Sequence, residues 1–484
     1  MKENCLLYIS LLIIINILMN CSNPSNESST PFLTITSTTP DGTYIGDDSI
    51  NISITFGDSV TLINDSLVIT LQTGGIDNLI KIGMFEMTKK INGTYTVQHC
   101  DYSEDLRVIS LKLQGTGKLL DRNSVEIVDL SIPSGNNLSD NSNIKLQTTI
   151  EITSNISDVT EWKGNNVYII KKYDFYVNNT LTIHPGVVVK FHPDEGPYMM
   201  LSGSATIIAR GTAEKPIIFT SFKDDTHWCD NNGDGSATQP AAKDWGEINT
   251  NSTNGSVFEY CEFYYGGNST YNATLTLYGD NFKVKNCTFA HNDGSYTSGN
   301  HARTGVLNAE DAGSNTIIQN NVFYNNVMPL SISEKFNLDN TNRFYNPNNQ
   351  SITNTYNSIW IHPEDDISSN IAWEETEVAF VVNEIGMTVA TGGRLTLGND
   401  VVIKFMSDAQ LILDEGEQNI PNYNGTGVFF TSYKDDTRKG DTNGDGAVTT
   451  PANNDWIGIY DNRVPTSTPD PYYFQWTNIF YDKY

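Results

Sequence analysis

The sequence predicts an all-β protein in which an N-terminal β-sandwich is followed by a solenoid of short stacked strands. Three observations carry this prediction. Apolar residues alternate at period two in the first part of the chain, short apolar strands punctuated by Asn and Gly fill the rest, and one long signature occurs twice. With 484 residues, the chain can hold several domains with sizeable cores.

The amino terminus predicts the compartment. Lys2 precedes an apolar run from Leu6 to Met19, which is too short to span a bilayer but suits the apolar region of a signal peptide. Leu18-Met19-Asn20-Cys21 resembles a bacterial lipoprotein signal, although Asn20 stands where Gly or Ala is usual. The resemblance implies a signal peptide over residues 1–20, lipidation of Cys21 and a location in the bacterial cell envelope, at the outer membrane or cell surface. Ordinary secretion and a short membrane anchor are the alternatives.

A polar tether, residues 21–30, leads into a predicted β-sandwich over residues 31–148. Ile50, Ile52 and Ile54 alternate with polar residues, which gives one apolar face at period two. Leu67, Ile69 and Leu71 repeat the pattern before a Thr-Gly-Gly turn, and Tyr95 and Val97 repeat it again. The strand and turn pattern of this segment resembles bacterial immunoglobulin-like or cadherin-like surface repeats. The resemblance implies a spacer or adhesive module.

From residue 149 to residue 484 the motifs change. Leu-Thr-Ile-His-Pro-Gly-Val-Val-Val-Lys-Phe (181–191) and Gly-Thr-Ala-Glu-Lys-Pro-Ile-Ile-Phe-Thr-Ser (211–221) resemble repeats of the right-handed parallel β-helix in the pectin-lyase-like superfamily. Three later coils end on Phe263, Phe289 and Phe323, in steps of 26 and 34 residues, which suits one turn of a solenoid. Equivalent side chains of successive coils stack about 4.8 Å apart, so these rings predict an internal aromatic ladder. Asn286 and Asn320 predict an amide ladder at a turn.

Two homologous segments lie within the predicted β-helix, at about 160–256 and 371–474. Trp162, Phe219 and Trp245 each recur at one constant offset, as Trp373, Phe430 and Trp456. A repeat of this kind indicates a duplicated, elongated architecture. The four cysteines beyond Cys21 show no CxxC spacing and no framework of disulfides; Cys261 and Cys287 occupy equivalent positions, where they either stack or pair.

Each homologous segment carries one candidate calcium loop. Carboxylates and amides at every second position, followed by Gly, place hard oxygen donors on one side of a tight loop, which suits Ca²⁺. The loops resemble EF-hand or dockerin loops, but Ala241 and Ala452 stand where a bidentate acid is expected. The ligands that we predict for the two sites are Asp230, Asn232, Asp234, Ser236 (carbonyl) and Asp244 in the first, and Asp441, Asn443, Asp445, Ala447 (carbonyl) and Asp455 in the second. The Asp224-Asp225 and Asp435-Asp436 pairs are alternative sources of the missing charge, and a metal-free turn closed by Asx hydrogen bonds is the alternative to a metal site.

The composition bears on the partners. With 57 acidic and 29 basic residues, the net charge is −28, which disfavours nucleic acid and anionic lipid as partners and limits membrane contact to a lipid anchor. No catalytic residues are assigned, because Asp293, Glu310 and Asp311 form no recognisable pattern and the basic residues nearby are isolated. The expected function is therefore non-catalytic calcium binding at the cell surface, with adhesion to a glycan or an extracellular protein. A polysaccharide lyase or glycoside hydrolase of the pectin-lyase-like superfamily is the alternative.

Overall fold

The computed structural model describes residues 33–192, 198–251, 253–268, 273–294, 304–463 and 472–484. The predicted signal peptide, the tether and Cys21 lie outside these residues. The chain forms two compact units, of which the first contains residues 33–44, 48–97 and 101–146. The second contains Ile45–Asp47, Gln98–Cys100 and Gln147–Tyr484. In the described parts of the chain, no helix is both long and apolar enough to cross a membrane.

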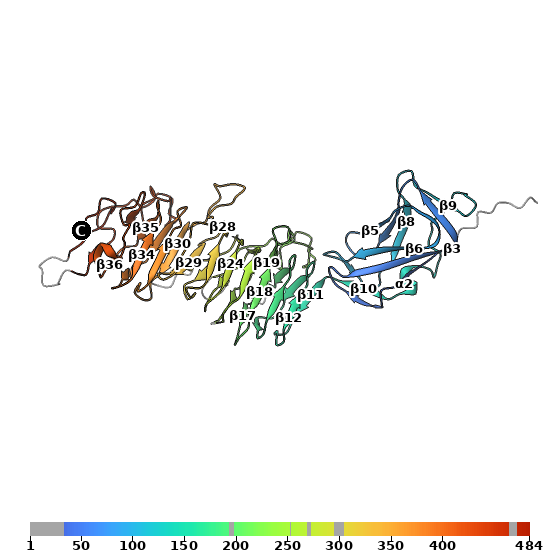
Figure 1. The fold of residues 1–484 in the computed structure, drawn as a ribbon, viewed down its shortest axis with the longest axis horizontal. Helices are drawn as coiled ribbons and strands as arrows, with labels where there is room; N and C mark the ends of the chain where they lie inside the picture. The colour runs from blue at the N-terminus through green and yellow to red at the C-terminus, as the bar shows by residue number, and fades with distance from the viewer. Residues whose placement is uncertain (1–32, 193–197, 252, 269–272, 295–303, 464–471) are drawn as a thin grey trace, which may run out of the picture. The chain divides into compact units, whose positions relative to one another are not determined.

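The first unit is built from two antiparallel sheets and one small sheet with a parallel strand pair, around one core (Figure 1). One sheet has the order β1-β3-β6, with β9 also paired to β3; another has the order β5-β4-β8; and a small sheet joins β2, β10 and β7. The elements are β1 (Leu33–Ser37), β2 (Gly42–Tyr44), β3 (Ser49–Ile63), β4 (Leu67–Leu71), β5 (Asn78–Ile82), β6 (Phe85–Thr96), β7 (Tyr102–Ser103), β8 (Val108–Leu113), β9 (Lys118–Asp121), the short helix α2 (Leu138–Asn141) and β10 (Ile144–Gln147).

The alternation in the sequence defines the core of this unit. Ile50, Ile52 and Ile54 of β3 are fully buried, and so are the apolar residues of β4 at every second position. Asn137 caps α2 in a capping box with Asp140, which satisfies free backbone donors at the start of a very short helix. Two antiparallel sheets enclosing one apolar core agree with the expected sandwich, and its immunoglobulin or cadherin kinship stays a prediction.

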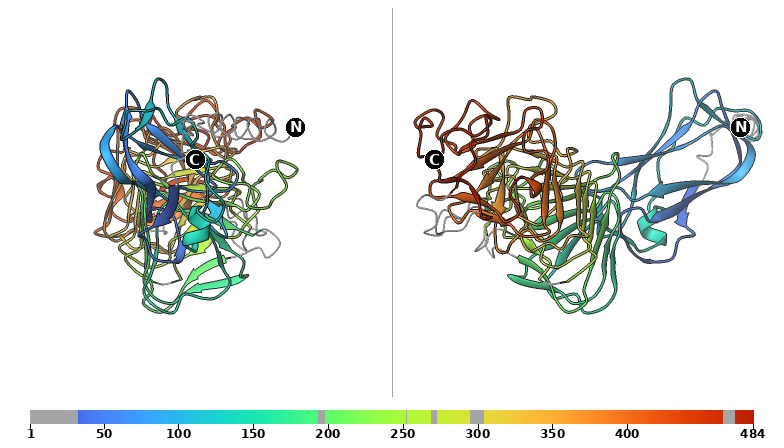
Figure 2. Two further views of the ribbon diagram at one scale, coloured as in Figure 1. Left: turned by 90° about the vertical axis from the view of Figure 1, so that its right-hand side faces the viewer. Right: turned by 60° about the vertical axis from the view of Figure 1, so that its left-hand side comes forward.

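The second unit is a parallel β-helix, as the sequence predicts. Its strands fall into parallel sheets, and successive members of each sheet come from successive coils (Figure 2). The first sheet contains β11 (Thr149–Ile152), β13 (Val167–Ile170), β16 (Val188–Phe191), β19 (Ile217–Ser221), β22 (Cys261–Tyr264), β25 (Thr288–Ala290) and β28 (Val322–Tyr324). The second contains β12 (Thr160–Trp162), β15 (Leu181–Ile183), β18 (Ile207–Arg210), β21 (Val257–Glu259), β24 (Lys283–Lys285) and β27 (Ile317–Gln319).

The third sheet continues through both homologous segments. It contains β14 (Asp174–Val177), β17 (Tyr198–Leu201), β20 (Ile248–Asn249), β23 (Leu275–Thr276), β26 (Leu307–Ala309), β29 (Leu330–Ser333), β30 (Ser358–His362), β32 (Ala379–Val382), β35 (Val402–Phe405) and β37 (Phe429–Ser432). Two smaller parallel sheets and a 3-10 turn complete the unit: β31 (Asn370–Trp373) with β34 (Arg394–Leu397), then β33 (Met387–Val389), β36 (Gln410–Leu413) and β38 (Gly458–Asp461), and η2 (Gly416–Gln418).

The predicted aromatic ladder is confirmed and is longer than expected. Phe263 and Phe289 stack with ring centroids 4.6 Å apart, and Phe289 and Phe323 with centroids 5.1 Å apart. Phe219 extends the stack at one end and Phe344 at the other. The ladder arises because the parallel register places Phe289 directly between the two neighbouring rings.

The asparagine ladder, in contrast, lies at other residues than predicted. Asn286 and Asn320 occupy left-handed turn positions, with φ of 55° and 56°. The hydrogen-bonded stack runs instead from the Asn292 side chain to Asn326 and on to Asn354. Each of these amides also donates to a backbone carbonyl of a neighbouring coil, which satisfies buried polar groups at the turn.

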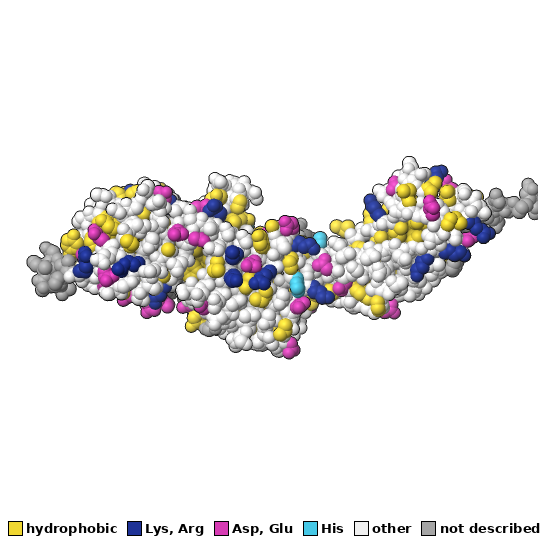
Figure 3. Space-filling model, viewed as in Figure 1, with side chains coloured by type: hydrophobic (Ala, Val, Ile, Leu, Met, Phe, Trp, Pro, Cys, Tyr) yellow, Lys and Arg dark blue, Asp and Glu magenta, His cyan; other side chains and the backbone are white. Residues whose placement is uncertain are grey.

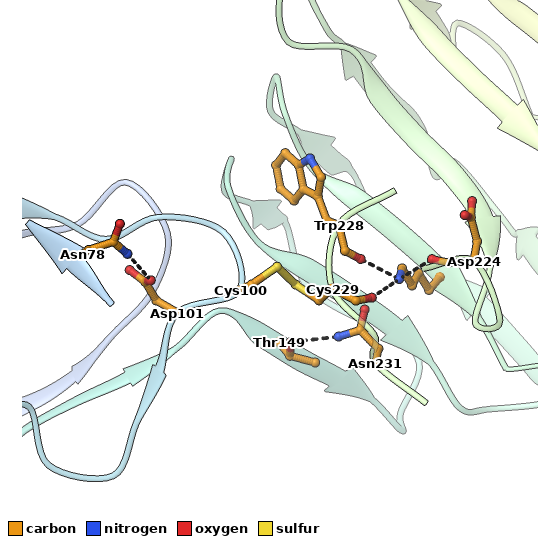
Figure 4. Close-up of a disulfide and its surroundings, with 9 residues drawn as sticks. Asn78, Cys100, Asp101, Thr149, Asp224, Trp228, Cys229 and Asn231 are labelled. Carbon is orange, nitrogen blue, oxygen red and sulfur yellow. Dashed lines mark hydrogen bonds between the residues drawn. A yellow bond between two sulfur atoms is a disulfide. The ribbon is translucent and has the colours of Figure 1, made fainter. Parts of the chain in front are cut away.

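The four described cysteines separate into a disulfide and two thiols. Cys100 and Cys229 form a disulfide that closes a separation of 129 residues within the second unit (Figure 4). Cys100 has a φ of 64°, in the left-handed region that favours glycine. Cys261 and Cys287 are buried and unpaired by a disulfide, so they stack as thiols.

Candidate metal centres

The two copied loops have the same framework. The first loop follows β19 and the second follows β37, and a tryptophan closes each loop region. Trp245 stacks on Phe191 and Trp456 on Phe405, both with ring centroids 4.2 Å apart and an interplanar angle of 6°. Because the anchoring contacts repeat so closely, the two loops have nearly the same geometry.

Three carboxylates converge in each loop. Oxygen atoms of Asp225, Asp230 and Asp234 lie within 4.8 Å of one another in the first. Asp436, Asp441 and Asp445 form the same arrangement in the second. Oxygen ligands bind Ca²⁺ at about 2.3–2.6 Å, so two ligands of one ion lie at most about 5 Å apart. The spacing therefore fits one cation of this size in each loop.

Asp225 and Asp436 are the members of these clusters with unused binding capacity. Both carboxylate oxygens of Asp225 and one oxygen of Asp436 are shielded from solvent and accept no hydrogen bond from the described residues. Burial, followed by repulsion from Asp230, raises the pKa of Asp225. The same two causes, with Asp441 in place of Asp230, raise the pKa of Asp436. A bound cation would supply the missing partner and remove the repulsion.

Backbone donors fix the first ligand of each loop. The Asp230 carboxylate accepts hydrogen bonds from the backbone N–H of Gly233 at 2.7 Å and of Gly235 at 2.8 Å. Gly235 has a φ of 74°, so a residue with a side chain is strained at this turn. Asp441 accepts equivalent bonds from Gly444 and Gly446. A third bond comes from the backbone N–H of Asp234 (3.2 Å) or Asp445 (3.3 Å), so three lone pairs of each carboxylate are used and one remains available to a cation.

A buried lysine lies beneath each loop. The ammonium of Lys190 donates to the carbonyl oxygens of Asp224 (2.7 Å), Trp228 (2.8 Å) and Cys229 (2.9 Å), which anchors the loop at its start. Burial lowers the pKa of Lys190 to about 8, and the nearby aspartates oppose this shift. When the ammonium is charged, it and the three carboxylates of the cluster have a combined charge of −2, which one Ca²⁺ neutralises. In the second copy, Lys404 donates to the Gly440 carbonyl and the Thr442 hydroxyl.

The other ligands predicted from the sequence divide into two groups. Asn232 and Asn443 lie inside the loops, where their side-chain oxygens accept bonds from the backbone N–H of Asp234 and Asp445. Ser236 and Ala447 follow the loop glycines and are exposed. The role of these residues as metal ligands stays a prediction.

Asp244 and Asp455 lie apart from the clusters. The Asp244 carboxylate accepts bonds from the Ser221 hydroxyl (2.7 Å), the Lys223 ammonium (2.9 Å) and the backbone N–H of Ala241 (3.0 Å). Asp455 makes the same three contacts with Ser432, Lys434 and Ala452. These acids hold the loop ends together, and the second acids of the two Asp-Asp pairs, Asp225 and Asp436, are the ones that join the clusters.

The first acids of the pairs are also structural. Asp224 is fully buried, and burial alone would raise its pKa. Hydrogen bonds from His227, Thr220 and Thr226 lower that pKa well below its usual range. In the second copy, Asp435 accepts a bond from Arg438 where the first copy has His227. The two copies therefore keep the acid and differ in the side chain that contacts it, His227 in the first and Arg438 in the second.

Aromatic and histidine rings form a strip on the outer face of the first sheet. The His227 and Tyr264 rings stack with centroids 4.7 Å apart, and His291 lies 5.7 Å from Tyr265 and 5.9 Å from Tyr324. All five rings are half-buried, so each shows part of its surface to solvent.

An acid-lined groove of about 370 Å³ lies elsewhere on the β-helix. Glu310, Asp311, Glu334, Glu364 and Asp365 line it, with Lys335 as the cation. Burial raises the pKa of Glu310 to about 8, and one of its oxygens lies 3.0 Å from Nε2 of His362. The acids come from three successive coils, so their convergence depends on loop lengths that the sequence pattern does not show.

One comparison with known proteins finds a relationship. Residues 154–277 match the family described as a pectate-lyase-like beta helix domain. The match covers the first candidate metal loop and agrees with the stacked parallel sheets around it. No curated protein and no solved structure shows significant similarity to the chain.

Proposed function

We propose that this chain is a non-catalytic, calcium-binding lipoprotein of the bacterial cell surface, whose β-helix is stiffened by Ca²⁺ at two copied loops. The observation that carries the proposal is the set of shielded, unpartnered carboxylate oxygens of Asp225 and Asp436, each beside two further aspartates. The lipid anchor at Cys21 is supported by the sequence alone.

Isothermal titration of the purified chain with CaCl₂ tests the calcium sites. Two sites are expected, and extracellular modules bind Ca²⁺ at about 10⁻⁴–10⁻³ M, so the titration must reach millimolar metal. The absence of binding heat up to 10⁻² M, or heat that persists in a D234A/D445A variant, would overturn the proposal.

The proposed role is adhesion to a glycan or an extracellular protein. The strip of His227, Tyr264, Tyr265, His291 and Tyr324 supports a glycan, because sugar rings stack on exposed aromatic faces. A glycan array identifies the ligand. Binding that is lost in Y265A/Y324A but kept in Y278A, a variant at a 45% exposed tyrosine outside the strip, supports the strip as the binding surface.

The second candidate function is cleavage of an acidic polysaccharide in the acid-lined groove. It is favoured by Glu310, because an acid with a pKa near 8 holds its proton at neutral pH and can serve as a general acid. Reducing ends and unsaturated-uronate absorbance are measured on a panel of polysaccharides. Turnover that falls at least 100-fold in E310Q would establish the enzyme and replace the non-catalytic proposal.

A further inference from the structure

The first unit contains a groove that runs along an open sheet edge. Strand β8 pairs with β4 on one side, and the order β5-β4-β8 leaves its other side at the edge of the sheet. A groove of about 670 Å³ follows this edge. Its lining consists of Arg107, the six residues of β8, Asn137 and four residues of the segment 128–132.

The backbone of β8 presents unused hydrogen-bonding groups to this groove. The N–H of Gln114 bonds to the Ser66 carbonyl, so the backbone groups of Gln114 face β4. In an antiparallel strand, the N–H and C=O groups of successive residues point alternately toward the partner strand and away from it. The N–H and C=O groups of Leu111 and Leu113 therefore point outward. No described residue bonds to them through its backbone. The edge can accept two or more residues of an added strand.

Asn137 shows what this edge binds. Its side-chain amide accepts from the Val108 N–H and donates to the Val108 C=O, both at 2.9 Å. An amide in this position imitates the peptide group of a neighbouring strand at the start of β8. The groups further along the same edge are equally suited to a real peptide.

The walls of the groove define the chemistry of the occupant. Ile109 is 45% exposed and Val128 is 82% exposed, so the groove offers apolar contacts to alternate side chains. Hydrophobic side chains are visible on the surface of the first unit in the area of β5 and β8 (Figure 3). The charged residues in the lining are Arg107 and Lys112, both basic, in a chain of net charge −28.

We propose that β8 binds an extended segment of another protein, with alternating apolar and acidic residues, by adding it as a strand to the β5-β4-β8 sheet. A second copy of this chain fits the edge less well, because antiparallel pairing of two β8 strands would bring basic residues together and the chains repel each other. The proposal concerns the first unit and is independent of calcium binding by the β-helix.

Fluorescence anisotropy with labelled eight-residue peptides tests the proposal on the intact chain. The probes are acetyl-(Val-Asp)₄-amide, acetyl-(Val-Lys)₄-amide and the acidic peptide N-methylated at every second residue. We expect the acidic peptide to bind at least tenfold more tightly than the other two. Equal affinity for the three peptides, or no binding of the acidic peptide at millimolar concentration, would overturn the proposal.

Two variants and one site-resolved measurement localise the binding. Lys112→Glu should lower the affinity for the acidic peptide at least tenfold. Lys81→Glu is the matched control, because Lys81 and Lys112 both lie opposite Val68, on the two strands that flank β4, and Lys81 does not line the groove. Hydrogen exchange should slow at Leu111 and Leu113 when the acidic peptide is added. Equal effects of the two variants, or slowed exchange at these amides by self-association without peptide, would contradict the assignment.

Discussion

The identity of the third carboxylate in each loop leads to the sharpest prediction. The structure assigns this role to Asp225, whereas Asp244 binds Lys223 and Ser221. We therefore expect Asp225→Asn to remove calcium binding from the first loop and Asp244→Asn to preserve it. Each change removes one negative charge and keeps the shape of the side chain, so the two variants are matched controls.

The magnitude follows from the geometry of the cluster. An ion equidistant from three oxygens that lie within 4.8 Å of one another is at most about 2.8 Å from each, and Ca²⁺–oxygen contacts are about 2.3–2.6 Å long, so an ion of this size lies about 2.4 Å from each once bound. At that distance, one unit charge and Ca²⁺ attract by about 3.5 kcal/mol in a medium as polar as water, which is a lower bound for the shielded oxygens of Asp225. Loss of this attraction weakens binding roughly 300-fold. A site of millimolar affinity then drops out of the measurable range.

Calorimetric titration measures both variants. Asp225→Asn should reduce the stoichiometry from two Ca²⁺ to one, and Asp244→Asn should leave it at two. Asp244→Asn should instead lower the free energy of unfolding by about 1–3 kcal/mol, because three hydrogen bonds, one of them buried, lose their charged acceptor. The reasoning is refuted if Asp225→Asn retains both sites with near-normal affinity, or if Asp244→Asn loses one.

Three further predictions concern other parts of the β-helix. Replacing Cys100 and Cys229 together by Ser should lower the Ca²⁺ affinity of the first loop about three- to tenfold in the same titration and leave that of the second loop unchanged. The reason is that the disulfide fixes the residue directly before the first ligand. Phe289→Ala should lower the free energy of unfolding by about 3–5 kcal/mol in urea titrations, since it opens a cavity in the aromatic ladder, whereas Tyr278→Ala, at a 45% exposed residue, should change it by less than about 0.5 kcal/mol. Burial raises the pKa of Glu310 from 4.5 to about 8, so the folded state binds this proton more tightly than the unfolded chain does. The free energy of unfolding therefore falls as the pH rises from 5 to 9. In Glu310→Gln this fall is absent, so between these pH values the free energy of unfolding of the variant should rise by up to about 4 kcal/mol relative to the original protein.

Each of these results can contradict the account. Equal weakening of both loops in the disulfide variant would show that the disulfide does not act on the first loop. A loss below 1 kcal/mol in Phe289→Ala would contradict a tightly packed ladder. The same pH dependence of urea unfolding in Glu310→Gln and the original protein would show that Glu310 titrates normally.

The sequence predicts the architecture well because stacking constrains it directly. In a parallel solenoid, equivalent positions of successive coils lie on top of one another, so the recurrence of Phe263, Phe289 and Phe323 directly predicts which residues stack. The predicted position of the amide ladder was wrong by a few residues because asparagine has two uses in the coils. Asparagine serves both left-handed turns, as at Asn286, and stacked side chains, as at Asn292, and the sequence alone does not separate the two uses.

The candidate site was harder to predict in detail. Duplication copies structural acids and ligand acids alike, so the recurrence of Asp244 as Asp455 carried no information about metal binding. Their contacts with Lys223 and Lys434 become visible only in three dimensions. The sequence also contains no pattern that pairs Cys100 with Cys229, because the two cysteines lie 129 residues apart.

A crystal structure grown with CaCl₂, with anomalous difference maps, tests the central claim most directly. The account predicts one anomalous peak in each loop, about 2.3–2.6 Å from oxygens of Asp225, Asp230 and Asp234 and of their counterparts Asp436, Asp441 and Asp445. Loops without a peak in the presence of millimolar Ca²⁺, or a peak held by Asp244 and Asp455 instead, would contradict it.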